Sequence, residues 1–341
     1  MSKSLLFWIG ENNQPVISDR SSDSVMDSVI NYYGSQEPKL PYSFKELFLD
    51  NGAFTSALNG IELETEKVIC VQEAIWPDRT IPVDYPSRPG MSMSTIRKNW
   101  ERTKANVTFW QESTKLRKKL VAPLHAWDKT SLRENIGWLQ KHADTDLLAI
   151  GSLVNLTRLY GYFGDRQPSM EVVDLLRLSI ETVRKKSDFK VHIMGFGSSP
   201  LMLHLAYYLG ADSTDSAGYR RKAAFGKIVL PGTGERYVGN SSAKFGLTKY
   251  SQDDLEKLKA CDCPTCRANQ DQLWTDWKAR AVHNDYVMKH EVENAQKYAG
   301  QGRDRYEAFL DKTFEASSLR YLWEYSKLKV TYPRISEAMR K

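Results

Sequence analysis

Three cysteines in the C-terminal third of the chain have the spacing of a metal site. Cys261, Cys263 and Cys266 form a C-x-C-x₂-C array, which holds three of the four cysteines of the protein. Thiolates this close together on one loop can wrap a single tetrahedral ion, and soft sulfur ligands select zinc. In a reducing compartment such clustering indicates metal binding rather than a disulfide framework. The array therefore predicts a zinc site. The alternative is three unliganded surface cysteines, which would be prone to oxidation.

The fourth ligand of this site must come from another part of the chain. His283 and His290 lie in helical segments that follow the array, and either imidazole could reach back to the loop. Cys70 lies far earlier, inside another predicted helix, and is expected to be a buried core thiol. A site with four protein ligands is closed, so the zinc ion is expected to be structural rather than catalytic.

A second group of polar residues stands at the ends of short apolar runs. The carboxyl ends of all strands in a parallel barrel face one rim, where active sites are built. We therefore expect these residues to converge, although Asp and Gly also punctuate strand ends for purely structural reasons. They are Asp50, Asp84, His125, the pair Gly151-Ser152, Gly195 and Asp215.

The elements that must position these residues alternate between strand-like and helix-like segments. Strands alternating with helices indicate a parallel α/β architecture. Seven such units favour a (β/α)₈ TIM barrel, and a doubly wound sheet is the alternative. We expect residues 1–240 to form the barrel and residues 241–341 a zinc-binding helical subdomain. The apolar runs are 5–9, 46–50, 80–84, 120–125, 147–151, 190–195 and 211–215, and the helical segments are 64–76, 93–110, 131–141, 170–186 and 200–209.

Composition narrows the class of protein. The 341 residues are 41% hydrophobic and 26% charged, and 9 Trp, 17 Tyr and 12 Phe argue against disorder. No apolar run approaches the roughly 20 residues that cross a bilayer, and the first residues lack a signal-peptide pattern. A cytoplasmic protein is expected, in a host cell if a phage encodes it. The net charge of +6 permits a phosphate-rich partner.

Together these features resemble the tRNA-guanine transglycosylase superfamily, whose members are (β/α)₈ barrels with a zinc-bearing C-terminal subdomain. The most specific part is the segment CDCPTC at 261–266 followed by AVHN at 281–284. It is similar to the C-x-C-x₂-C array and His-Asn helix of the family. The resemblance implies that His283, rather than His290, is the fourth zinc ligand.

The first half of the chain carries further motifs of this superfamily in the same order. Residues 49–54, LDNGAF, resemble a D-S-G-G-[YF] strand end, which makes Asp50 the general acid/base and Phe54 the stacking surface for the base. Asp84 ends a strand that resembles the one whose Asp reads the guanine edge. His125 occupies the place of a Gln that contacts the base.

The later motifs complete the implied site. Residues 149–153, AIGSL, resemble A-I-G-G-L, so Gly151 and Ser152 are expected to offer backbone groups to the base. Residues 193–197, IMGFG, resemble the M-G-V-G turn, which places Met194 and Gly195 beside the base. Residues 210–215, GADSTD, resemble G-x-D-x-F-D, whose last Asp is the nucleophile. Asp215 is the implied nucleophile here.

Two carboxylates suit this reaction, because base exchange at a glycosidic carbon passes through an oxocarbenium-like transition state. Asp215 would attack C1′ and displace guanine, and Asp50 would protonate the departing purine and later deprotonate the incoming one. A duplex target would have to flip its base out of the stack. Arg220, Arg221 and Lys222 follow the nucleophile and are expected to contact phosphates. The basic stretch 115–119 precedes a strand and is expected at the opposite rim.

The sequence also bears on the substrate. A branch of the superfamily, found in phage and bacterial modification systems, inserts 7-deazaguanine derivatives into DNA. Departures from the usual motifs at Asn51, Ala53, His125 and Ser152, and after Asp215, favour this branch. The expected partners are double-stranded DNA and a free base such as 7-cyano-7-deazaguanine, with a homodimer possible. The alternatives are tRNA as the substrate, a non-catalytic partner subunit, and a zinc-containing nucleic-acid-binding module.

Overall fold

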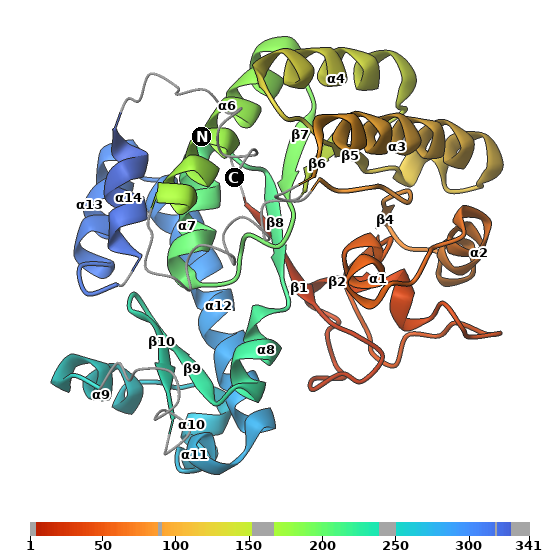
Figure 1. The fold of residues 1–341 in the computed structure, drawn as a ribbon. Coiled ribbons are helices and arrows are strands. Elements are labelled where there is room, and N and C mark those ends of the chain that lie inside the picture. Colours follow the sequence, from red (N-terminus) through yellow and green to blue (C-terminus); the bar gives the residue numbers. More distant parts are fainter. Residues whose placement is uncertain (1–4, 88–90, 152–166, 239–249, 318, 329–341) are drawn as a thin grey trace.

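The fold is described by a computed structural model that covers residues 5–87, 91–151, 167–238, 250–317 and 319–328. Eight parallel strands form one sheet with a ring of helices outside them (Figure 1). The strands are β1 (Leu6–Gly10), β2 (Ser24–Ser28), β3 (Glu46–Asp50), β4 (Arg79–Thr80), β5 (Ala122–Leu124), β6 (Leu147–Ile150), β7 (Lys190–Ile193) and β8 (Ser213–Ser216).

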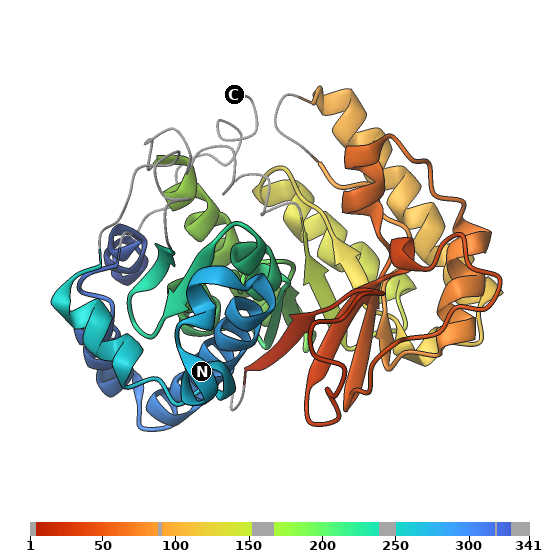
Figure 2. The same ribbon diagram turned by 90° about the horizontal axis from the view of Figure 1, so that it is seen from below.

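The strand order shows a TIM-like barrel rather than a doubly wound sheet. The order is β4-β3-β2-β1-β8-β7-β6-β5, so each strand lies beside its neighbours in the chain and β1 lies beside β8. The two edge strands meet at a parallel bridge between Thr80 and Leu120, and the Val121 N–H donates to the Thr80 carbonyl at 2.8 Å. The sheet therefore curls round on itself, as Figure 2 shows from below.

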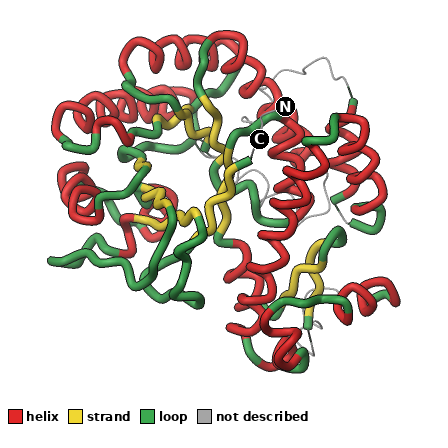
Figure 3. Tube along the Cα trace, turned by 180° about the vertical axis from the view of Figure 1, so that it is seen from behind, coloured by secondary structure: helices red, strands yellow, loops and turns green. Residues whose placement is uncertain are grey.

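The helices between the strands agree with the segments expected from their apolar spacing. Figure 3 shows them in red around the yellow strands. Those that follow β2 to β8 are η1 (Val29–Asn31), α1 (Ala53–Asn59), α2 (Thr65–Ile75), α3 (Met93–Ser113), η2 (Arg117–Lys119), α4 (Lys129–His142), α6 (Gln167–Lys186), α7 (Pro200–Leu209) and α8 (Gly218–Ala224).

Two sequence predictions need correction. The apolar runs omitted β2, because its sequence SVMDS contains three polar residues and is too short to stand out. It nevertheless pairs in parallel with both β1 and β3. Cys70 is exposed on α2 rather than buried, because the buried side of that helix is formed by Val68, Ile69, Val71 and Gln72.

The barrel interior is filled by one apolar layer to which six strands and their ends contribute. Side chains that point inward from successive strands must fill the space, because a small barrel is a packed core and not a pore. This layer consists of Trp8, Met26, Phe48, Ile81, Val121, Leu147 and Ala149.

The C-terminal helices cover the side of the barrel near β1. No α-helix is present among the described residues between β1 and β3, so β1 needs another cover. Ile9 of β1 packs with Tyr219 and Ala223 of α8 and with Ala281 of α12. Gln296 of α12 also donates to the Leu5 carbonyl at 3.1 Å.

The remaining elements form the metal-site end and the C-terminal pair of helices. They are the antiparallel hairpin β9 (Lys227–Leu230) and β10 (Gly234–Tyr237), then α9 (Gln252–Lys259), α10 (Pro264–Asn269), α11 (Gln272–Thr275), α12 (Trp277–Ala299), α13 (Arg303–Thr313) and α14 (Arg320–Lys327). Within the described ranges, no helix has the length and apolar character needed to cross a membrane.

Candidate active site and metal centre

One cavity of about 350 Å³ opens at the carboxyl ends of the strands. Its walls come from the ends of β1 to β8 and the loops that follow them, which is the rim where a parallel barrel places its ligands. The structure brings together here most of the site residues expected from the sequence, namely Asp50, Phe54, Asp84, Gly151, Met194, Gly195, Asp215 and Arg221. Ser152 lies outside the described residues.

Asp215 stands near the end of β8 with its carboxylate held from one side. Its Oδ1 accepts the Gly195 N–H at 2.6 Å and lies 3.2 Å from Nε2 of His192. Gly195 adopts φ +66° in the turn after β7, a conformation that a residue with a Cβ rarely adopts. The turn therefore aims a backbone donor at the carboxylate, which stays partly exposed to the cavity.

Asp50 ends β3 on the same cavity. Its Oδ2 accepts the Gly52 N–H at 3.0 Å and lies 3.4 Å from the Ser28 hydroxyl. Burial raises the pKa of Asp50; the Gly52 N–H opposes that shift, and the nearby charges of Asp84 and Asp215 reinforce it, so that the pKa reaches about 7. A carboxyl with this pKa can both donate and accept a proton near neutral pH.

Gly52, which follows this strand end, has two reasons to be glycine. Its φ is +80°, and a Cβ built there would lie 2.9 Å from the Cβ of Ile30. The sharp turn starts α1 directly after the strand and so places Phe54 on the cavity wall.

Asp84 is fixed by two polar neighbours. Its Oδ1 accepts from Asn51 Nδ2 at 2.9 Å, and its Oδ2 lies 2.7 Å from Nε2 of His125. His125 is buried, packs edge-on against Trp100, and is not part of the cavity wall. Nε2 of His125 thus pairs with Asp84, and the expected contact of His125 with the base stays a prediction.

The three basic residues after the nucleophile have different surroundings. Arg221 is exposed and lines the cavity. Arg220 is bound by Glu11 at 2.9 Å, and the buried ammonium group of Lys222 lies 2.9 Å from Glu235. The expected phosphate contact is therefore wrong for Lys222, which is buried, and Arg220 is held inside the fold by an internal carboxylate.

Several residues that line the cavity or contact its side chains escaped the sequence analysis. Asp27 and Ser28 lie on β2, the strand that was missed, and Asp27 accepts from the Tyr32 and Tyr42 hydroxyls at 2.7 and 2.6 Å. His192 lies within an apolar run, where a single His reads as a core residue. The signal available was its position two residues before Met194, on the barrel-facing side of β7.

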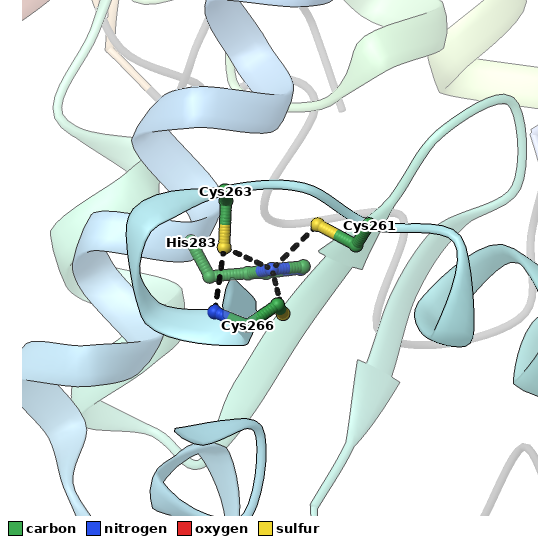
Figure 4. A group of neighbouring side chains, drawn as sticks. All are labelled: Cys261, Cys263, Cys266 and His283. Carbon is green, nitrogen blue, oxygen red and sulfur yellow. Dashed lines mark hydrogen bonds between the residues drawn. The ribbon is translucent and has the colours of Figure 1, made fainter. Parts of the chain in front are cut away.

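The candidate metal centre lies beside the β9–β10 hairpin. The thiols of Cys261, Cys263 and Cys266 lie 3.5, 3.4 and 3.5 Å from Nδ1 of His283, and the four side chains converge in Figure 4. A tetrahedral ion with ordinary zinc–sulfur and zinc–nitrogen bonds separates its sulfur and nitrogen ligands by about 3.6 Å. The donor set and its spacing therefore fit such an ion.

The surrounding contacts also suit metal binding. Nε2 of His283 lies 3.0 Å from the Val229 carbonyl, so this nitrogen must carry the proton and Nδ1 is left with the free lone pair. His290 instead is exposed and pairs with Glu293 at 3.1 Å. Of the two histidines left open by spacing, His283 is the one that belongs to the cluster.

Comparisons with known proteins agree with this arrangement. Residues 32–318 match the profile of the family described as queuine tRNA-ribosyltransferase. The tRNA-guanine(15) transglycosylase of Haloferax volcanii is 27% identical over 223 residues, which cover 64% of this chain and 38% of the relative. The protein of that name from Methanothermobacter thermautotrophicus is 25% identical over 265 residues, which cover 75% of this chain and 36% of the relative. The matched part thus spans well under half the length of these relatives.

Proposed function

The chain belongs to the queuine tRNA-ribosyltransferase family, and on that premise we propose that it exchanges guanine in a polynucleotide for a 7-deazaguanine base. The observation that carries the proposal is the placement of Asp50 and Asp215 on one cavity, where their charges interact. Asp215 offers a carboxylate oxygen to the cavity for attack, and Asp50, with a pKa of about 7, can hold a proton near neutral pH. Two such groups are what base exchange with a covalent intermediate requires.

The reaction would proceed in two displacements. An oxygen of Asp215 attacks C1′, the glycosidic C–N bond breaks, and the Asp50 carboxyl gives its proton to the departing guanine. The incoming base then attacks C1′ from the vacated side, loses its N–H proton to Asp50, and releases Asp215 as a carboxylate. Asp50 is protonated again at the end, so no further proton donor is needed, and the configuration at C1′ is retained.

Recognition of the base would fall to other residues of the cavity wall. Asp84 is an acceptor, which suits the N1–H and exocyclic amine of guanine-like bases. Its hydrogen bonds to Asn51 and His125 fix the carboxylate orientation. Phe54 offers a ring face for stacking, and Met194 closes the apolar side. Arg221, at the edge of the cavity, is the candidate for a phosphate contact.

We propose that the Cys261, Cys263, Cys266 and His283 cluster holds a structural zinc ion. All four ligand positions come from the protein, which leaves none for a substrate. The ion would tie α10 and the loop before it to α12, and α12 packs on both α8 and β9. The metal would therefore stabilise the elements behind Arg221 without taking part in the reaction.

The finer proposal is that the polynucleotide is DNA. It rests on the departures from the usual motifs at Asn51, Ala53 and His125, of which His125 pairs with Asp84. The second candidate is tRNA, which the names of the relatives favour.

Base exchange with labelled substrate tests both the proposed reaction and the identity of the polynucleotide. Labelled guanine, and separately labelled 7-cyano-7-deazaguanine, are offered with duplex DNA or with bulk tRNA to the wild type and Asp215→Ala. Asp146→Asn, which changes a carboxylate at the opposite end of the barrel, is the matched control. Label that enters DNA only in the wild type and the control supports the full proposal. Label in tRNA alone refutes the DNA substrate and keeps the reaction. Equal label with Asp215→Ala refutes the mechanism.

A further inference from the structure

A buried histidine touches the proposed nucleophile from inside the barrel. Nε2 of His192 lies 3.2 Å from Oδ1 of Asp215, and Nδ1 lies 2.9 Å from the hydroxyl of Ser213. Its side chain has no exposed surface, and Phe48 packs edge-on against the imidazole at 5.2 Å between ring centroids. Ser213 is the residue opposite His192 in the β7–β8 ladder, and Asp215 is two residues further along β8. The strand register alone thus brings the three side chains together.

This arrangement favours one tautomer of His192. A neutral imidazole has one N–H donor and one lone pair. A proton on Nε2 points at the carboxylate, whereas a lone pair there would face the negative oxygen and repel it. The hydroxyl of Ser213 can donate to the lone pair left on Nδ1. The contacts therefore select the Nε2–H form, which donates to Asp215.

Both hydrogen bonds that the described residues make to the Asp215 carboxylate end on the same atom. The Gly195 N–H and His192 Nε2 converge on Oδ1 from two sides. Oδ2 is then the atom available for attack on C1′. When that attack forms the ester, Oδ1 becomes its carbonyl oxygen and keeps both donors.

We propose that His192 is a positioning residue that presents Oδ2 of Asp215 for attack and stabilises the carboxylate when it departs. The inference rests on the proposed function, since it assigns a role within that reaction. In the second displacement the C1′–Oδ2 bond breaks and its electron pair returns to the carboxylate. Negative charge then builds on both carboxylate oxygens, and the hydrogen bond from His192 to Oδ1 becomes stronger. Loss of His192 slows this second step most, so the covalent intermediate accumulates.

The test uses full-length protein with His192→Leu and His192→Gln. Leucine keeps the apolar volume and removes the donor, whereas the glutamine amide can reach the Nε2 position and donate. Each protein is mixed with the polynucleotide that the wild type modifies, chased with excess free base, and quenched in detergent to measure the covalent adduct. We expect the adduct of His192→Leu to decay about ten- to a hundredfold more slowly than that of the wild type, with His192→Gln close to the wild type. Decay of the His192→Leu adduct at the wild-type rate, or equal slowing in both variants, would overturn the proposal.

Two further measurements separate this role from a purely structural one. Ser213→Ala leaves His192 in place and removes only the partner of Nδ1, so it should slow the same step to a smaller extent; an unchanged second step in this variant counts against the proposal. Nitrogen NMR of histidine-labelled protein reports the tautomer without any activity, and the chain has only six histidines to assign. We expect the Nε2–H form in the wild type and a shifted signal in Asp215→Asn, whereas the Nδ1–H form refutes the inference. Absence of any wild-type adduct would refute the proposed function, while the NMR result would still decide the geometry.

Discussion

Replacing Asp50 by asparagine should abolish activity. It should also make the protein more stable than the wild type, by an amount that grows as the pH rises. The pKa of Asp50 is about 7 in the fold against an ordinary value of 3.8, chiefly because burial disfavours the charged form. Between these two values the folded protein binds more protons than the unfolded chain, so the free energy of unfolding falls with rising pH. Below about pH 4 both states are protonated and no penalty exists. Above about pH 7 the full penalty is present.

The size of the effect follows from the shift. About three pKa units correspond to about 4 kcal/mol, which is an upper bound because Asp50 is partly open to the cavity. A chain of this length unfolds with an entropy of about 0.7 kcal/mol/K, so the largest gain in Tm is about 6 °C at pH 8. Asparagine keeps a carbonyl oxygen for the Gly52 N–H and the Ser28 hydroxyl, so little else should change.

The assay is thermal or urea unfolding of the wild type and Asp50→Asn from pH 4 to pH 8, together with base exchange. Asp146→Asn is the control, because its change in stability relative to the wild type should be opposite to that of Asp50→Asn. Partial burial raises the pKa of Asp146, but the hydrogen bond and charge of Arg79, with help from Lys190, outweigh it and lower the pKa overall. The control should therefore be less stable than the wild type at neutral pH, and the difference should shrink as the pH falls toward the acidic range. A gain for Asp50→Asn that is the same at pH 4 and pH 8 would refute the reasoning.

Three other outcomes are expected. Cys266→Ser should lose bound zinc, measured by metal analysis, and should have a lower Tm than the wild type. Cys70→Ser changes an exposed thiol outside the cluster and should show neither effect. Zinc retained by Cys266→Ser would contradict the assignment of the metal site. Phe54→Leu should raise KM for the free base about tenfold or more with Tm unchanged, because stacking on an aromatic ring is lost, and an unchanged KM would exclude that role. Asp84→Asn should lower kcat/KM for guanine about a hundredfold, because the amide replaces one acceptor oxygen by a donor. If kcat/KM in the base-exchange assay equals that of the wild type, Asp84 does not recognise the base.

The fold could be predicted from the sequence wherever buried strands and amphipathic helices leave a strong pattern. The helices at 65–75, 93–113 and 200–209 begin and end close to the expected positions, because apolar spacing and the Trp76-Pro77 and Gly210 stops are local signals. The strand β2 could not be predicted in this way. The segment SVMDS owes its place to pairing with β1 and β3 on either side, which no local pattern records.

For the candidate site, the sequence by itself determined which residue types stand at the strand ends and which three thiols lie close together in the chain. Those features are local, since strand ends and short loops are set by neighbouring residues. Only the tertiary structure decided the partners. It turned His125 toward Asp84 and set the buried His192 against Asp215. It also brought His283, which the family resemblance had implied, to the three thiols, a choice that spacing alone had left open.

The pKa of Asp50 likewise depends on tertiary structure, because it arises from burial and from two charges that lie far away in the sequence. The physical reason is the same in each case. Hydrogen bonds and Coulomb interactions act over a few ångströms, and closure of the barrel determines which distant strand ends come within that range.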